Sequence, residues 1–202
     1  LCLNIGGFAN VSFQSDSERI AYDICPANIV LNHYTRLKGM EYDDKGEIAS
    51  GGSINKELLD ELNNLDFYLR ERPKSLGYEF IEDTVLPLIE KFETSFKDTL
   101  RTFVEHVAMQ IANEINATSA FLNKGKTTVL ITGGGAYNDF MIKRISDLSD
   151  AKIHIPPDKI IEFKEALIFA LLGVLKDQEE INCLKSVTGA SKNHSSGVVY
   201  GS

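Results

Sequence analysis

The chain has 202 residues and a formal net charge of −8, with 43% hydrophobic and 25% charged residues. This length fits one large domain, or one domain with an insertion, and the composition is that of a soluble globular protein. The sequence shows no clustered lysines and arginines of the kind that a nucleic-acid-binding surface needs. No apolar run approaches the roughly 20 residues that span a membrane. We therefore expect no nucleic acid and no membrane among its partners.

The three cysteines, Cys2, Cys25 and Cys183, lie far apart in the sequence and match neither a disulfide framework nor a zinc site. Such cysteines are typical of a reducing cytoplasm. The chain also opens inside a predicted strand, at Leu1, without an initiator methionine. We expect a cytoplasmic fragment that forms the second half of a longer protein.

Three short β-rich segments come first, at residues 1–5, 9–13 and 19–23. The pair Gly6-Gly7 and a polar run connect them, and both connections are compatible with hairpins. These segments predict three antiparallel strands in a meander.

Helical spacing follows the meander, and it predicts a helix at residues 27–37. Residues 39–79 are rich in loop signals around one short helix at 54–65. We interpret this region as an insertion folded over one edge of the core. A continuous apolar stripe from Phe96 to Ile115 then predicts a long helix.

Alternating strands and helices complete the chain. A strand at 128–132 runs into three glycines and an amphipathic helix at 139–148, and a strand at 152–155 follows. The last helix, at 163–175, is apolar around most of its circumference, which predicts that it is buried. Residues 186–202 have the composition of a polar tail.

Two glycine turns each follow a predicted strand: Gly6 and Gly7 early in the chain, and Gly133, Gly134 and Gly135 late in it. Glycine lets the backbone approach a ligand closely, and the helix after the second turn offers N–H groups to an anion. We predict that both turns lie on one edge of the sheet and hold one phosphorylated ligand. The alternatives are a simple hairpin at the first turn and close helix–strand packing at the second.

The order of elements is three strands, a helix, the insertion, a helix, and then strand, helix, strand and helix. It predicts an α/β fold in a single domain over residues 1–202, with a mixed five-stranded sheet and helices on both faces. This order resembles the ribonuclease H-like fold of actin-like and hexokinase-like ATPases, which hold ATP between two such domains. The resemblance implies that the first glycine turn meets the phosphates and the second meets the adenosine.

Six short blocks narrow the resemblance. They resemble, in order, successive motifs of anhydro-N-acetylmuramic acid kinases: Asn4-Ile-Gly-Gly-Phe-Ala-Asn10, Asp23-Ile-Cys-Pro-Ala-Asn28, Pro73-Lys-Ser-Leu-Gly77, Thr132-Gly-Gly-Gly-Ala-Tyr-Asn138, Lys164-Glu-Ala166 and Val187-Thr-Gly-Ala-Ser191. The resemblance implies a kinase that opens 1,6-anhydro-N-acetylmuramic acid with water and phosphorylates it from ATP and Mg²⁺. The product, N-acetylmuramic acid 6-phosphate, feeds cell-wall recycling. The implied partners are the missing N-terminal domain and the amino sugar. The sequence is also compatible with a homodimer, in which a second copy of the chain is a partner.

The candidate site follows from the turns and the resemblance together. Nucleotide contacts fall to Gly6, Gly7, Asn10, Gly133, Gly134, Gly135 and Asn138, sugar contacts to Glu165, and Mg²⁺, through water, to Asp23. Other roles stay open: Asn10 holds its turn, Asn138 caps a helix, and Asp23 forms an Asx-turn or a cap. Glu165 is either a buried carboxylate that accepts sugar hydroxyls or an exposed residue near a helix start.

The chain departs from the family at Ile24, Cys25 and Ala27, where the family usually has threonine and two glycines. The family's other phosphate loop and its general-base aspartate precede the position of Leu1. No catalytic residue is therefore assigned here, and we expect the chain alone to be inactive. The alternative function is a non-catalytic nucleotide-binding or sensing module of the same superfamily.

Overall fold

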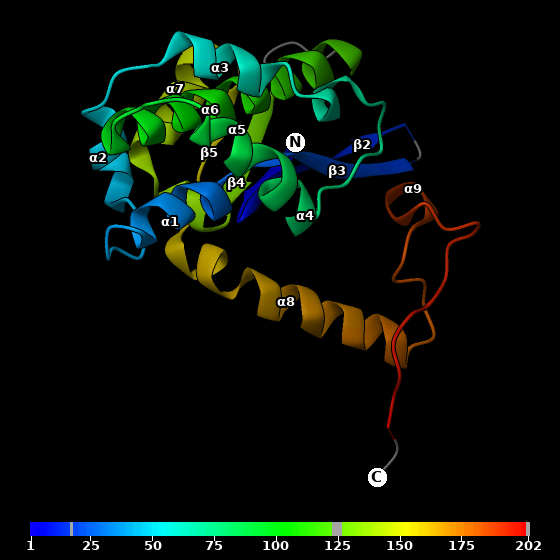
Figure 1. The fold of residues 1–202 in the computed structure, drawn as a ribbon. Coiled ribbons are helices and arrows are strands. Elements are labelled where there is room, and N and C mark those ends of the chain that lie inside the picture. Colours follow the sequence, from blue (N-terminus) through cyan, green and yellow to red (C-terminus); the bar gives the residue numbers. More distant parts are fainter. Residues whose placement is uncertain (17, 123–126, 201–202) are drawn as a thin grey trace.

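The computed structural model describes residues 1–16, 18–122 and 127–200. Its centre is a five-stranded sheet in the order β3-β2-β1-β4-β5 (Figure 1). The strands β1, β2 and β3 form an antiparallel meander, and β4 and β5 run parallel to β1. The mixed sheet confirms the prediction, and each predicted segment falls on an observed strand: β1 (Cys2–Ile5), β2 (Phe8–Ser15), β3 (Glu18–Pro26), β4 (Thr128–Thr132) and β5 (Lys152–His154).

The four long helices also agree with the sequence. They are α1 (Asn28–Arg36), α6 (Phe96–Phe121), α7 (Asp139–Leu148) and α8 (Asp158–Asp177). Side chains cap two of them, because Ser95 accepts the N–H of Asp98 at 3.2 Å and Asn138 accepts that of Met141 at 2.9 Å. The shorter helices are α2 (Glu47–Ser50), α3 (Lys56–Asn63), α4 (Tyr78–Phe80), α5 (Leu86–Glu90) and α9 (Lys185–Thr188).

Sequence reasoning missed the irregular helical segment at α4 and α5. A π-helical stretch, Ile81–Val85, joins these two helices, and Pro87 stands at the start of α5. Because the helical period changes within this short segment, its apolar residues do not follow the regular spacing from which an ordinary helix is predicted.

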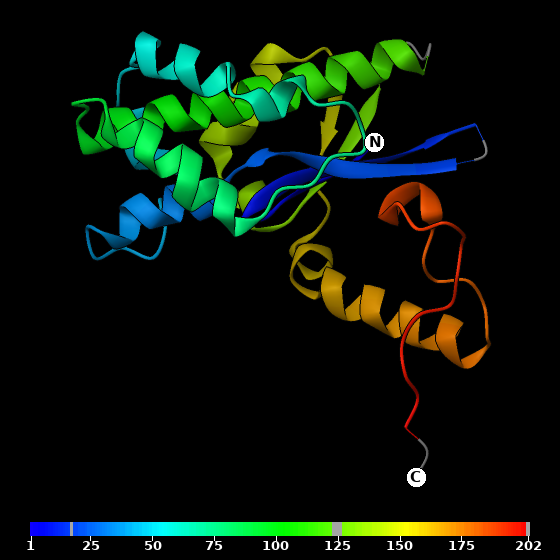
Figure 2. The same ribbon diagram turned by 45° about the vertical axis from the view of Figure 1, so that its right-hand side comes forward.

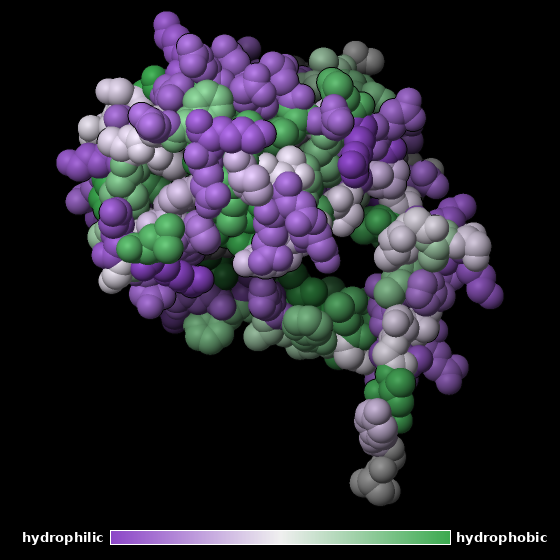
Figure 3. All heavy atoms as spheres, viewed as in Figure 1, coloured by the Kyte–Doolittle hydropathy of each residue, from purple (hydrophilic) through white to green (hydrophobic). Residues whose placement is uncertain are grey.

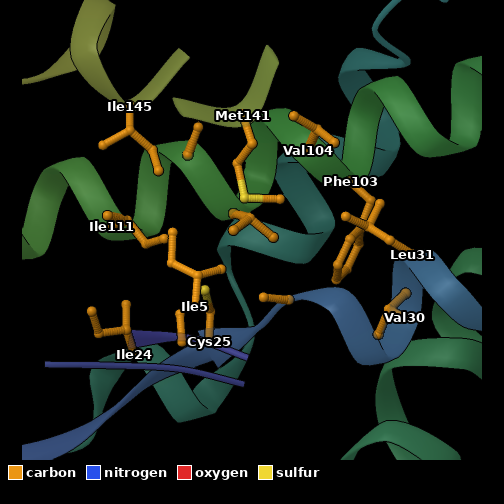
Figure 4. Packing of buried hydrophobic residues seen from close by; sticks show 14 of the residues in the cluster. Ile5, Ile24, Cys25, Val30, Leu31, Phe103, Val104, Ile111, Met141 and Ile145 are labelled. Atoms are coloured by element: carbon orange, nitrogen blue, oxygen red, sulfur yellow. The ribbon is translucent and has the colours of Figure 1, made fainter. Parts of the chain in front are cut away.

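The core lies between one face of the sheet and the layer of α6 and α7. Alternate residues of β1, Leu3 and Ile5, point into it and are fully buried. Figure 4 shows side chains of the sheet, including Ile5, meeting Ile111 of α6 and Met141 of α7. The opposite face of the sheet carries the intervening residues, and it is on this face that polar side chains gather.

The region 39–79 forms an outer layer on α6. Both α2 and α3 pack against α6, and the carboxylate of Asp43 anchors α2 by accepting the N–H groups of Ile48 and Ala49, each at 2.9 Å. The C-terminal part of region 39–79 reaches the edge strand β3 of the sheet. There the N–H of Asp23 donates to the carbonyl oxygen of Lys74 at 2.9 Å. That this region is an insertion stays a prediction.

Helix α8 contradicts the prediction that it is buried. In the described structure Ile161 is its one buried residue, whereas Phe163, Leu167 and Phe169 are 63%, 63% and 70% exposed. It lies on the side of the sheet away from α6 and α7 (Figures 1 and 2), and Figure 3 shows hydrophobic surface along it. A helix that is apolar all round needs a cover, and the described residues do not supply one.

The predicted tail at 186–202 includes the last turn of α9, and His194 pairs with Cys183 in an isolated β-bridge. Residues 201 and 202 lie outside the described residues. None of the helices in the described ranges is both long enough and apolar enough to cross a membrane.

A buried ion pair ties α7 to α6. Arg144 donates to both carboxylate oxygens of Glu105, at 2.8 and 2.7 Å, and Arg101 donates to the same carboxylate at 2.8 Å. Glu105 is only 6% exposed. The hydrogen bonds from Arg144 are the largest influence on the pKa of Glu105, which they lower despite the opposing effect of burial.

We predict that Glu105→Gln lowers the free energy of unfolding by about 2 kcal/mol at pH 7, because it removes charge-assisted hydrogen bonds. Since the folded pKa lies below the unfolded one, this stabilisation is complete above the unfolded pKa, near 4.5. It is lost as the pH falls through the folded pKa. Urea unfolding at pH 7 and at low pH measures the difference. The control Asp147→Asn removes a more exposed partner of Arg144 and is expected to change stability less than Glu105→Gln does.

Candidate functional site

The two glycine turns lie side by side on one edge of the sheet, as predicted. In the parallel pair of β1 and β4, Asn4 stands opposite Thr132, so both strands end at the same edge. The backbones are in close contact there: a Cβ added to Gly133 would lie 2.6 Å from the carbonyl oxygen of Ile5. One ligand can therefore reach both turns.

Backbone hydrogen bonds from the start of helix α1 hold the turn at Gly6 and Gly7. Gly7 accepts the N–H of Ala27 at 2.8 Å, and Gly6 accepts that of Asn28 at 3.2 Å. Neither glycine has a positive φ, and an added Cβ would make only ordinary contacts, 3.5 Å from Asn4 Nδ2 and 3.6 Å from Ile29 Cβ respectively. A hairpin alone therefore does not require glycine here, which favours the interpretation that a ligand approaches this backbone.

The three glycines of the second turn have different roles. Gly133 has φ +86°, and a Cβ on Gly135 would lie 2.3 Å from Cγ2 of Ile5, so these two are required by the backbone and by packing on β1. Gly134 has no positive φ, and its nearest neighbour, Nδ2 of Asn28, would lie 3.7 Å from an added Cβ. The packing alternative thus accounts for the outer glycines, while Gly134 faces open space.

That space is a pocket of about 670 Å³ next to Gly134. Helices α1, α7 and α8 and the loop before α2 enclose it, and its walls carry two exposed tyrosines, several amides and several carboxylates. Aromatic faces suit a planar base, and carboxylates accept hydroxyl protons from a sugar. The lining residues are Asn28, Leu31, Asn32, Tyr42, Asp43, Asp44, Lys45, Gly134, Ala136, Tyr137, Asn138, Asp139, Ile155 and Asp158.

Most of these lining residues were not predicted. Tyr42 and Lys45 come from the region interpreted as an insertion, and Asp158 from the first turn of α8. No motif marks them, because only the folded chain brings these segments together. Asn138 was predicted, but its side-chain oxygen caps α7, which is the alternative role considered for it.

A row of polar residues crosses the face of the sheet opposite the core. Thr132, Asn4, Asn10 and Asp23 are successive partners across β4, β1, β2 and β3. Paired residues of neighbouring strands point to the same face, so these side chains form one band behind the glycine turns. Asn10 therefore lies beside the first turn, though outside the pocket lining.

Asp23 is held at the end of this row. Its Oδ2 accepts the N–H of Leu76 at 2.8 Å and the hydroxyl of Ser75 at 3.2 Å. Within the described residues, no group of three or more His, Cys, Asp or Glu side chains is arranged to hold a metal ion. This donor set fits Mg²⁺ only indirectly, with one carboxylate acting through water while other ligands come from a substrate.

Glu165 does not join the pocket. It is an exposed residue of α8, so the prediction of a buried carboxylate is wrong. The neighbouring Lys164 turns inward instead. Its Nζ donates to Oδ1 of Asn4 and, at 3.2 Å, to Oγ1 of Thr132. Sequence reasoning quoted Lys164 as part of a motif but did not assign it to the site.

We predict that Gly135→Ala destabilises the fold by about 1–3 kcal/mol, because its methyl group would overlap Ile5. Gly134→Ala is the matched control, and we expect a change below about 0.5 kcal/mol. Thermal and urea unfolding of both variants test the distinction. Equal losses of stability would contradict the separate roles of the two glycines.

The sheet order, the strand directions and the adjacent glycine turns define an α/β domain of ribonuclease H-like topology. The model of the family described as anhydro-N-acetylmuramic acid kinase matches residues 1–202. The chain belongs to this family.

Relatives named anhydro-N-acetylmuramic acid kinase include proteins of Aliivibrio fischeri and Haemophilus influenzae. The first is 34% identical over 208 residues, covering 98% of this chain and 55% of the relative; the second is 33% identical over 215 residues, covering 98% and 56%. The chain thus spans about half the length of the curated relatives it matches, and it corresponds to their C-terminal half.

Two solved structures are more distantly similar. They are the activator of the 2-hydroxyisocaproyl-CoA dehydratase from Clostridium difficile with bound ADPNP and the (R)-2-hydroxyglutaryl-CoA dehydratase component A of Acidaminococcus fermentans. The first is 14% identical and covers 90% of this chain and 63% of that chain; the second is 16% identical and covers 82% and 57%. Both have a TM-score of 0.47.

Proposed function

We propose that the chain is the nucleotide-binding C-terminal half of an ATP-dependent kinase that opens and phosphorylates 1,6-anhydro-N-acetylmuramic acid. The product would be N-acetylmuramic acid 6-phosphate, formed in the cytoplasm during cell-wall recycling. The observation that carries the proposal is the adjacency of the two glycine turns at one edge of the sheet. Family membership supplies the substrate.

In this proposal the adenosine occupies the pocket beside Gly134, and the phosphates extend toward Gly6 and Gly7. The exposed side chains of Tyr42 and Tyr137 offer aromatic faces to the base, and Asp158 offers a carboxylate to the ribose hydroxyls. Asn10 supports the phosphate turn from the polar row.

Mg²⁺ would neutralise charge on the phosphates, with Asp23 reaching it through water. Oδ1 of Asp23 is the oxygen available for this contact among the described residues, because the hydrogen bonds from Ser75 and Leu76 both go to Oδ2. Glu165 is accessible to a sugar bound outside the pocket, since it is an exposed residue of α8, the helix whose first turn lines the pocket.

The departures from the family motif do not alter the proposed ligand surface. Ile24, Cys25 and Ala27 are at most 3% exposed, and Ala27 uses its N–H to bind the carbonyl of Gly7. These residues therefore pack beneath the turn. Because these substitutions leave the proposed ligand surface unchanged, we prefer the kinase function to that of a non-catalytic sensing module.

The N-terminal half that the relatives carry would complete the site. It would supply the second phosphate loop and the general base, and it would cover the exposed apolar side chains of α8, such as Phe163 and Phe169. A homodimer contact is the other candidate cover for this helix.

We predict that the 202-residue chain does not turn over the anhydro-sugar. A general base alone contributes about 10²- to 10⁴-fold to rate, and positioning of the phosphates is also incomplete. The measurement is sugar-dependent release of ADP by the purified chain. Measurable turnover would show that the catalytic group lies within these residues.

In the full-length parent, we predict that Gly134→Val abolishes ATP binding, because its side chain enters the nucleotide pocket, while the fold stays intact. Glu165→Gln should keep ATP affinity and lower sugar phosphorylation, because it loses the charge and keeps its size. Titration of ATP and a turnover assay of both variants make the comparison. If Glu165→Gln weakens ATP and leaves the sugar reaction unchanged, Glu165 contacts the nucleotide.

A further inference from the structure

Lys164 of α8 contacts the polar row and forms no ion pair within the described part of the chain. Lys164 is half-buried beneath the sheet, and its Nζ is held by two neutral oxygens, Oδ1 of Asn4 and Oγ1 of Thr132. No ion pair of Lys164 exists among the described side chains. Burial lowers the pKa of this lysine, with the charge of Glu165 opposing that effect.

We propose that Lys164 and Asn4 form an anion subsite beside the first glycine turn, and that it takes the terminal phosphate of the bound nucleotide. This inference rests on the proposed function and assigns one position of the phosphate chain. An ammonium group removed from water without a paired charge is unfavourable, and a bound phosphate would relieve that cost.

The side-chain amide of Asn4 provides a second hydrogen-bond donor, Nδ2, beside the first glycine turn. Because a lysine can only donate, its contact with Oδ1 fixes which end of the amide faces Lys164. The other end, Nδ2, then faces the turn: a Cβ added to Gly6 would lie 3.5 Å from it. Lys164 thus offers a charge itself and orients a second donor beside Gly6.

The geometry favours the end of the phosphate chain over its beginning. The nucleoside pocket is lined by Gly134 but by neither Gly6 nor Lys164, so the subsite lies beyond the pocket. Its groups are donors, as a phosphate requires. The carboxylate of Asp23 lies two strands away in the row and is bound to Leu76. The carboxylate of the acidic sugar has similar chemistry, and the test must separate the two anions.

The test is a series of calorimetric titrations of the 202-residue chain with adenosine, AMP, ADP and Mg²⁺–ATP, and separately with N-acetylmuramic acid, at constant ionic strength. For Lys164→Met we expect unchanged affinity for adenosine and about 10-fold or greater loss for ATP, the effect of removing a charge-assisted contact. Lys164→Arg should restore most of the ATP affinity, and Asn4→Ala should show a smaller loss that also depends on phosphate. The control is Lys159→Met, which removes an exposed lysine of the same helix and should change nothing.

The outcomes separate this inference from the proposed function. If wild-type protein binds ATP and Lys164→Met binds it equally well, the subsite is wrong and the nucleotide site remains. Equal losses for adenosine and ATP would indicate a structural role for Lys164 and would also overturn the subsite. If Lys164→Met instead weakens only N-acetylmuramic acid, the anion is the sugar carboxylate, and the phosphate assignment is wrong. If the wild-type chain binds neither adenosine nor any of the three nucleotides, both proposals fail.

Discussion

The parallel pairing of β1 with β4 is the constraint on which the site depends. It joins β1, the first strand of the chain, to β4, which comes after the long helical region of the sequence. In this pairing Asn4 lies opposite Thr132. This register brings the two glycine turns to one edge and aligns the polar row on the face away from the core. A shift of one residue would turn Asn4 into the core and Ile5 toward Lys164.

The sequence predicts the frame of the domain well, because strand alternation and helical spacing are local properties. It could not assign the three glycines individually. Only the folded structure shows that Gly133 and Gly135 pack closely against Ile5, whereas Gly134 lines the pocket. Tyr42 illustrates a second limit, since a loop residue without a motif enters a site only through the fold.

For helix α8, the sequence alone could predict neither the burial of its residues nor which of them faces the site. Neighbouring helical residues point about 100° apart, so either Lys164 or Glu165 faces the sheet, and an apolar helix carries no pattern that decides between them. The structure gives the inward position to Lys164. The apolar composition of α8 predicts a buried helix, whereas most of its apolar side chains are exposed in the described structure.

The central claim is that one nucleotide contacts both glycine turns. Titration of the isotope-labelled 202-residue chain with a non-hydrolysable ATP analogue and Mg²⁺, followed by backbone amide NMR, tests it most directly. The account predicts that the amides of Gly7 and Gly134 shift together and saturate with the same dissociation constant. Saturation at different ligand concentrations, or a response at only one of the two turns, would contradict it.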